Sequence, residues 1–402
     1  MAHGRKGYFE MKLNTHTSRI PALLLAALHL SLVQLPTTAS AAAPAISTAL
    51  QPFVEKGDLA GAVALVASKD KVLAIEAVGF ADRATQRPMK TDAIFWIASQ
   101  SKPITGAAVM MLVDEGKLNL DDAVEKYLPE FKGQKVVAGK NADGTPLLKA
   151  PVHPITVREV LSHTSGLPFK SAAEQPTLDG LSLRDAVRSY AATPLIFEPS
   201  TKYTYSNAGI NTAARLIEVL TGQSYEAFMD VRLFKPLGMT DTTFWPNAEQ
   251  IKRIATPHKP NAAKTGLETN SISQLRYPLD DRAKRFPMPA GGLFATASDV
   301  AKFCQMVLNG GELNGKRYLS AKAVKEMTSR QTPASLKESY GLGWSAGATF
   351  GHGGALATNM SIDPARGLIT VWLVQHAGYP GEGGKAQGAF VKAAQELFGK
   401  KP

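Results

Sequence analysis

Strand-like segments lie near both ends of this sequence, and helical patterns fill the middle. Residues 61–68 and 71–80 are apolar runs on either side of a Lys69-Asp70 turn, which predicts a hairpin of two sheet strands. Residues 368–374 form a third apolar run near the other end of the chain. Because such strands must bury their apolar faces, the pattern favours one sheet built from both ends of the chain, with a helical insertion between them.

The middle of the chain carries helix signals. Thr156-Val-Arg-Glu159 is a capping box, in which each of the two side chains accepts a hydrogen bond from the other residue's backbone. Ser298 is expected to cap a later helix that runs to Leu308. Helical spacing is also found in residues 104–115, 183–190, 208–220, 225–233 and 386–398.

Two stretches have no helical or strand period. Residues 129–155 are loop-like, with a small hairpin expected at Asn141-Ala-Asp-Gly144. Residues 256–290 are polar and rich in proline, and a loop of that length is usually functional, such as a lid. We expect both stretches to supply walls of a substrate site.

The first 41 residues have the three-part pattern of a secretory signal peptide. Lys12 and Arg19 precede an apolar run over residues 20–35, and Ala39-Ser40-Ala41 follows as a cleavage signal. An uncleaved membrane anchor is the alternative, and the short run with Pro21 inside it disfavours that alternative. We therefore expect an exported protein, periplasmic or secreted, without stable membrane insertion after removal of the signal.

Charge and cysteine content narrow the function classes. Forty-five Lys+Arg against 34 Asp+Glu give a net charge of +11, but the basic residues form no cluster interleaved with aromatic residues, so no nucleic-acid partner is indicated. Cys304 is the single cysteine, which excludes a disulfide framework and a thiolate metal cluster. The histidines show no metal-ligand spacing, and we expect neither a metal nor a cofactor.

Three short motifs carry the candidate chemistry, and the first is Ser99-Gln-Ser-Lys102. The serine directly precedes a predicted helix, and residues three apart share a helix face, so the hydroxyl and the amine converge. Burial and the positive helix N-terminus would lower the lysine pKa, and a neutral lysine can take the serine proton. Alone, this spacing is a weak signal, because it occurs by chance in many surface helices.

The second motif is Tyr203-Thr-Tyr205-Ser-Asn207, directly before a predicted helix. A tyrosine hydroxyl near Lys102 could relay a proton to a leaving group, and Asn207 could hydrogen-bond both the lysine and a substrate carbonyl. The alternative is a turn tyrosine followed by an asparagine helix cap.

The third motif is Phe350-Gly-His352-Gly-Gly354-Ala355. Glycine in a strand often indicates the close approach of another backbone, so a substrate lying alongside this strand would fit. The Ala355 N–H group would then donate into an oxyanion hole. The alternative is a glycine-rich turn with a solvent-exposed histidine.

In this order the three motifs resemble those of the serine β-lactamase and penicillin-binding-protein superfamily. More narrowly, they are similar to the branch of class C β-lactamases, carboxylesterases on that fold and D-amino-acid peptidases. The resemblance implies an α/β (α+β) fold, in which an antiparallel sheet flanked by helices carries an inserted all-helical lobe. Residues 46–128 together with 285–400 would form the sheet lobe, and residues 129–284 the mainly helical lobe.

The resemblance also implies a role for each motif residue. Ser99 would be the acylated nucleophile and Lys102 its base, with Tyr205 as the partner of the lysine. The N–H groups of Ser99 and Ala355 would form the oxyanion hole. The substrate-binding residues would be Asn207, His352, Gly353, Gly354 and Ala355.

One position departs from the β-lactam pattern. In the family the third box is typically Lys-Thr-Gly, or His-Thr-Gly in some peptidases, and its lysine and threonine help to hold the antibiotic carboxylate. Here Gly353 has no hydroxyl group, and a histidine such as His352 is largely neutral at pH 7. Binding of an anionic β-lactam is therefore weakened, whereas ester hydrolysis needs neither group.

Two other patterns compete with this assignment. Lys264-Thr-Gly266 is a literal Lys-Thr-Gly, but no strand pattern follows it. Gly343-Trp-Ser345-Ala-Gly347 matches a nucleophile elbow, with Asp363 and His376 after it in α/β-hydrolase order. An elbow requires a strand, a sharp turn and a helix, and the segment after Ser345 is glycine-rich and strand-like.

The sequence thus predicts an exported serine hydrolase, a carboxylesterase that acts on a small-molecule ester or amide through a Ser99 acyl-enzyme. A β-lactamase, or a D-amino-acid peptidase or amidase, is the alternative within the same fold. A non-catalytic envelope binding protein is the alternative of another class, because a fold alone does not fix a function. Acyl and alcohol preference and oligomeric state are left open.

Overall fold

The computed structural model describes residues 45–400. The predicted signal peptide over residues 1–41 therefore lies outside the described residues. Within residues 45–400 no helix has the length and apolar character needed to cross a membrane.

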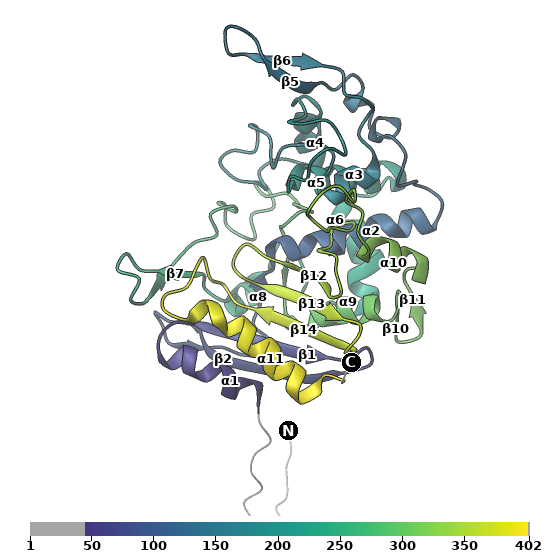
Figure 1. Ribbon diagram of the computed structural model, residues 1–402. Helices are drawn as coiled ribbons and strands as arrows, with labels where there is room; N and C mark the ends of the chain where they lie inside the picture. Colours follow the sequence, from purple (N-terminus) through teal and green to yellow (C-terminus); the bar gives the residue numbers. More distant parts are fainter. Residues whose placement is uncertain (1–44, 401–402) are drawn as a thin grey trace, which may run out of the picture. The chain divides into compact units, whose positions relative to one another are not determined.

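A six-stranded antiparallel sheet forms the base of the molecule (Figure 1), with the strand order β12-β13-β14-β1-β2-β3. The first and last thirds of the chain meet where β1 pairs with β14, in a register that places Val63 opposite Leu373. The predicted sheet built from both ends is therefore confirmed. The strands are β1 (Gly61–Ala67), β2 (Val72–Asp82), β3 (Arg87–Pro88), β12 (Phe350–Gly353), β13 (Asn359–Asp363) and β14 (Leu368–Leu373).

Helices cover both faces of the sheet. Alternate residues of a strand point to opposite faces, and in β1 Ala64 and Val66 pack with α1 (Ile46–Glu55) and α11 (Ala386–Phe398). Val63 and Leu65 belong to the larger core on the other face, where α9 (Ala297–Leu308) packs against β1 and β14. Burial on both faces explains why β1 is apolar at every position.

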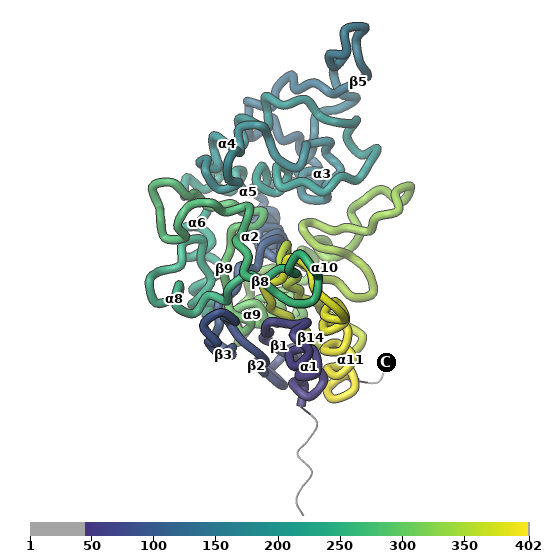
Figure 2. Tube along the Cα trace, turned by 90° about the vertical axis from the view of Figure 1, so that its left-hand side faces the viewer, coloured from purple at the N-terminus to yellow at the C-terminus, as the bar shows by residue number. Residues whose placement is uncertain are grey.

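The helix α2 (Ser101–Asp114) joins the sheet to a helical region. It lies between the sheet and the helices α3 to α5 (Figure 2). A short 3-10 turn, η1 (Ala98–Gln100), leads into α2. The other helices are α3 (Val157–Ser162), α4 (Leu183–Ala191), α5 (Asn207–Thr221), α6 (Tyr225–Met229), α7 (Lys235–Leu237), α8 (Ala248–Arg253) and α10 (Ala321–Thr328).

Small two-stranded sheets complete the described fold. The expected hairpin around Asn141-Gly144 is confirmed as β5 (Val136–Lys140) and β6 (Pro146–Lys149), at the end of the helical region far from the sheet (Figure 1). The remaining pairs are β4 (Phe95–Trp96) with β9 (Phe294–Ala295), β7 (His258–Pro260) with β8 (Leu267–Thr269), and β10 (Glu312–Leu313) with β11 (Lys316–Arg317).

The capping box at Thr156 and Glu159 is present at the start of α3, as predicted. The predicted cap at Ser298 is wrong: the Thr296 hydroxyl accepts the Asp299 N–H group at 3.3 Å, and α9 begins one residue before Ser298. Both residues can cap a helix, and the local sequence does not distinguish them. The predicted lobe limits at residues 128 and 285 stay predictions.

The stretch 256–290 is not a featureless loop, since it contains the β7–β8 hairpin. Strands of three residues are too short to show a period in the sequence. The expected helix over 225–233 also changes form, because α6 ends at Met229 and a π-helical turn covers Asp230–Phe234.

Candidate active site

Ser99 lies in η1, directly before α2, as its motif predicts. The preceding residue, Ala98, has a φ of +47°, which is uncommon for a residue with a side chain. The third motif packs against this turn, because a Cβ atom placed on Gly354 would lie 2.6 Å from the Ile97 carbonyl oxygen. Glycine at 354 is therefore required by the contact between the first and third motifs.

Lys102 is fully buried, and its amine has three polar neighbours. Its Nζ atom lies 3.0 Å from Ser99 Oγ, 2.8 Å from Asn207 Oδ1 and 2.8 Å from the Ala290 carbonyl oxygen. Burial lowers the pKa of Lys102 well below its ordinary value. A neutral amine has two N–H groups for the two carbonyl oxygens, so its lone pair faces the Ser99 hydroxyl.

The second motif reaches the amine from the start of α5. The Ser206 hydroxyl caps this helix by accepting the Gly209 N–H group at 3.0 Å. The alternative interpretation of Asn207 as the helix cap is therefore wrong, and its side chain is free to bind Lys102. His163 supports the turn, because its Nδ1 atom accepts the Ser206 N–H group at 3.1 Å.

Tyr205 lies over the same amine. Its ring centroid is 4.5 Å from Lys102 Nζ, and its hydroxyl is 3.5 Å from His352 Nε2. Burial raises the pKa of Tyr205, and a hydrogen bond with Ser99 opposes the shift. A phenol held neutral in this way is a weaker proton acceptor at neutral pH than the neighbouring buried amine.

His352 is buried in β12, so the alternative of a solvent-exposed histidine in a turn is wrong. Its Nδ1–H group donates to the Gly353 carbonyl at 2.6 Å, and its Nε2 atom accepts the Tyr340 hydroxyl at 2.8 Å. Burial, with the nearby Lys102 amine, lowers the pKa of His352 to about 3. The side chain is therefore a neutral imidazole with both nitrogens engaged. Gly353 and Ala355, by contrast, are exposed.

Two further residues contribute to the site, Tyr340 and Ala290, and neither belongs to a sequence motif. Tyr340 stands next to a glycine-rich turn that packs on α2, where a Cβ atom on Gly343 would lie 2.6 Å from the Lys102 carbonyl oxygen. Gly343 is the sequence feature that could have indicated a close contact in this segment. Ala290 contributes a backbone carbonyl, and a backbone group leaves no signature in residue type. The donor role of the Ser99 and Ala355 N–H groups stays a prediction.

The two competing sequence patterns, Lys264-Thr-Gly266 and the elbow around Ser345, are not part of this site. Lys264 to Gly266 is an exposed or half-exposed turn between β7 and β8. Ser345 forms isolated bridges with Tyr340 and Gly351, and the next element after it is the strand β12 instead of a helix. His376 accepts the Ala60 N–H group at 3.1 Å, while Asp363 binds Arg366. The elbow interpretation is therefore wrong.

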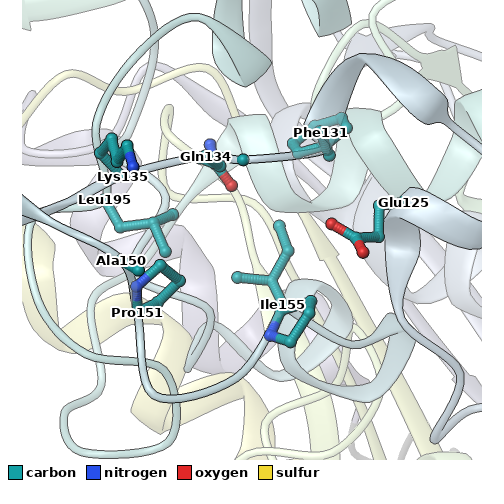
Figure 3. A pocket seen from close by; sticks show the side chains of 10 residues that line it. Glu125, Phe131, Gln134, Lys135, Ala150, Pro151, Ile155 and Leu195 are labelled. Atoms are coloured by element: carbon teal, nitrogen blue, oxygen red, sulfur yellow. The ribbon is translucent and has the colours of Figure 1, made fainter.

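A cavity of about 200 Å³ under the β5–β6 hairpin contains none of the predicted site residues. Figure 3 shows the Leu195, Ile155 and Pro151 side chains around it, with the Glu125 carboxylate at one side. Among residues 45–400 no cluster of three or more histidine, cysteine or acidic side chains could hold a metal ion.

Comparisons with known proteins identify the family of this chain. The family model described as Beta-lactamase matches residues 46–394. Esterase EstB of Burkholderia gladioli is 32% identical over 272 residues, which are 62% of this chain and 66% of that protein. A putative D-alanyl-D-alanine carboxypeptidase of Escherichia coli (strain K12) is 26% identical over 321 residues, 72% of this chain and 70% of that protein.

Among solved structures, EstCE1, described as a hydrolase with promiscuous acyltransferase activity, has a TM-score of 0.70 and 24% identity. The match covers 87% of this chain and 97% of that one. At this identity the likeness is one of fold, and it confirms the predicted antiparallel sheet with flanking helices.

Proposed function

This chain belongs to the beta-lactamase family, and from that premise we propose that it is an exported carboxylesterase that acts through an acyl-enzyme on Ser99. The family is one of serine hydrolases with esterase and peptidase members. The observation that carries the proposal is the buried Lys102 amine, which lies 3.0 Å from the Ser99 hydroxyl with its other two directions occupied by carbonyl oxygens.

The proposed reaction has two steps. Neutral Lys102 takes the Ser99 proton as Oγ attacks the ester carbonyl, and Tyr205 passes that proton to the departing alkoxide. The Ser99 and Ala355 N–H groups stabilise the oxyanion of the tetrahedral intermediate. Water then attacks the acyl-enzyme and gives a proton to the Lys102–Tyr205 pair. The pair returns this proton to Ser99 Oγ as the acyl–oxygen bond breaks, which releases the carboxylic acid and regenerates Ser99.

The preference for an ester follows from the third motif. A neutral, fully hydrogen-bonded His352 offers no positive charge to a substrate carboxylate, and Gly353 offers no hydroxyl. An anionic β-lactam or a peptide with a free carboxylate therefore gains little binding energy from this motif, whereas a neutral ester loses none. The relative named Esterase EstB supports the same choice.

The test is a set of substrates and one variant. Short-chain p-nitrophenyl esters should give a burst followed by steady turnover, and Ser99→Ala should abolish both. Nitrocefin assayed beside them separates the alternatives within the fold, since efficient nitrocefin turnover with feeble ester hydrolysis would identify a β-lactamase instead. Failure of fluorophosphonate and penicillin probes to label Ser99 would point to a binding protein.

Export is a separate part of the proposal. Fusion of residues 1–41 to a reporter that is active only outside the cytoplasm should give activity, and replacement of Leu24 and Leu25 within the apolar run by Arg should remove it.

A further inference from the structure

A line of hydrogen bonds starts at the Lys102 amine and runs away from Ser99 to a buried carboxylate. The Lys102 amine donates to the Ala290 carbonyl at 2.8 Å, and the Ala290 N–H group donates to Asn211 Oδ1 at 3.0 Å. Asn211 Nδ2 then donates to the Tyr190 hydroxyl at 3.0 Å, and that hydroxyl donates to Glu174 Oε1 at 2.7 Å. None of these five residues is more than 2% exposed.

The groups that form these hydrogen bonds fix which atom donates and which accepts in each one. A backbone N–H group can only donate, so the Ala290 N–H requires the oxygen of Asn211 on its side. The Asn211 amide nitrogen must then face Tyr190, whose oxygen accepts that bond and whose proton is left for Glu174. Every bond therefore points the same way, from the amine of Lys102 towards the carboxylate.

Three elements converge to build the line. Asn211 follows Asn207 by one turn of α5, so two asparagines on one helix face hold the lysine, one directly and one through Ala290. Tyr190 is on α4, and Glu174 lies in the loop before that helix. The acylation chemistry proposed above uses Asn207, whereas it leaves Asn211, Tyr190 and Glu174 without a role.

Glu174 has the surroundings of a carboxylate. Its Oε2 atom accepts the Ser171 N–H group at 2.8 Å, so both oxygens accept hydrogen bonds. Burial raises the pKa of Glu174, and the bonds from Tyr190 and Ser171 with the nearby Lys170 charge oppose the shift. A cavity of about 120 Å³ borders Glu174.

We propose that Glu174 is a positioning residue for the acylation of Ser99: through Tyr190 and Asn211 it holds the Ala290 carbonyl, which orients the Lys102 amine. This role rests on the proposed function. The carboxylate fixes the Tyr190 hydroxyl, which fixes the Asn211 amide, and the Asn211 oxygen holds the Ala290 backbone by accepting its N–H group. The Lys102 amine is then held with its third direction towards Ser99, and the Glu174 charge offsets part of the lowering of the Lys102 pKa by burial.

The effect of the Glu174 charge on the Lys102 amine can be measured, because few other titratable groups face that amine. Tyr205 and His352 face the Lys102 amine from the other two motifs, and His163 lies near it at the end of α3. Burial lowers the pKa of both histidines, and they stay neutral through the working range. Removal of the Glu174 charge should therefore lower the pH at which the Lys102 amine loses its proton.

The experiment measures the acylation burst with p-nitrophenyl acetate across pH, with Ser99 labelling followed by mass spectrometry. Tyr190→Phe keeps the buried ring and breaks the line, and it should lower kcat about 10-fold with KM nearly unchanged, as expected for a misplaced catalytic group. Glu174→Gln should move the rising limb of the pH profile to lower pH by roughly 0.5–1 unit.

Tyr318→Phe is the control. It removes the hydroxyl of a half-buried tyrosine, which donates to the Pro236 carbonyl at 2.7 Å and is outside the line. Its thermal stability should fall as in Tyr190→Phe, while its pH profile stays that of the unaltered protein.

Two results would overturn the role. If the Tyr190→Phe and Glu174→Gln proteins had the burst and pH profile of the control, Glu174 would have no positioning role, and the proposed function would still stand. An unaltered protein whose Ser99 takes no acyl group would remove the proposed function, and the positioning role with it. If Glu174→Gln fails to fold, Tyr190→Phe alone still tests the positioning role, because it removes only one oxygen atom.

Discussion

At the scale of single residues, the site is organised around the Lys102 amine, whose pKa is lowered well below its ordinary value by burial. Lys102 has two carbonyl oxygens for its two N–H groups and a hydroxyl for its lone pair. His352 lies close by, yet both of its nitrogens are engaged with Gly353 and Tyr340. The geometry therefore favours our proposal that the lysine, rather than the histidine, transfers the proton.

Lys102→Arg should reduce the acylation rate to nearly that of Ser99→Ala, because a guanidinium stays protonated and cannot act as a base. His352→Ala should lose less, since His352 lines the site without taking the proton. Burst kinetics with a p-nitrophenyl ester measure both variants. An active Lys102→Arg protein beside a dead His352→Ala protein would refute the assignment of the base.

Activity should increase with pH from neutral to alkaline conditions. Burial lowers the pKa of Lys102 well below its ordinary value of 10.5, and loss of that proton creates the base, so the limb rises with pH. The lysine and Tyr205 titrate as a unit, and the kinetic pKa belongs to both. His352, with a pKa lowered to about 3, adds no limb between pH 5 and 8. A pH–rate profile of kcat/KM checks this, and a bell centred near pH 6 would contradict it.

At the scale of elements, a buried ion pair holds the 256–290 stretch against the helical region. The Arg285 Nε atom lies 2.6 Å from Asp179 Oδ2, and both side chains are 1–2% exposed. The Phe286 N–H group also donates to the Asp179 carbonyl at 2.8 Å. The chain then runs directly into Ala290, so this pair anchors the segment that supplies an acceptor to Lys102.

Asp179→Ala should cost about 3–5 kcal/mol of unfolding free energy, because it leaves a buried guanidinium without its partner. Glu268→Ala is the control in the same stretch. It removes a half-exposed cross-strand pair with Lys259 at 3.2 Å, and such pairs contribute about 0–1 kcal/mol. Urea unfolding followed by circular dichroism measures both, and equal losses would contradict the anchoring role.

Sequence patterns predicted those elements whose signal is local. The apolar run of β1 and the capping box at Thr156 and Glu159 each follow from neighbouring residue types. The motifs predicted which side chains would meet, and the contact of Asn207 with Lys102 is present. What could not be predicted depends on tertiary packing, as with the Ala290 carbonyl and the Tyr340 hydroxyl, or on a choice between equivalent caps, as at Thr296.

At the scale of the whole described molecule, the site depends on pairing between distant parts of the chain. Ser99 follows the first strands, whereas His352 is on β12, and the two are linked across the sheet through β13, β14 and β1. Beneath this sheet, α11 covers β14, where Phe390 stacks on Trp372 with ring centroids 5.7 Å apart.

Phe390→Ala should therefore reduce both stability and the denaturant tolerance of activity, although Phe390 has no contact with the site. A buried phenylalanine truncated to alanine costs about 3–5 kcal/mol, and its loss removes the cover that holds the two ends of the sheet together. Urea midpoints measured by circular dichroism and by ester hydrolysis should fall together. The exposed Lys392→Ala on the same helix should leave both midpoints in place. If activity in Phe390→Ala survived beyond the loss of the sheet signal, the site would not need the strands from both ends.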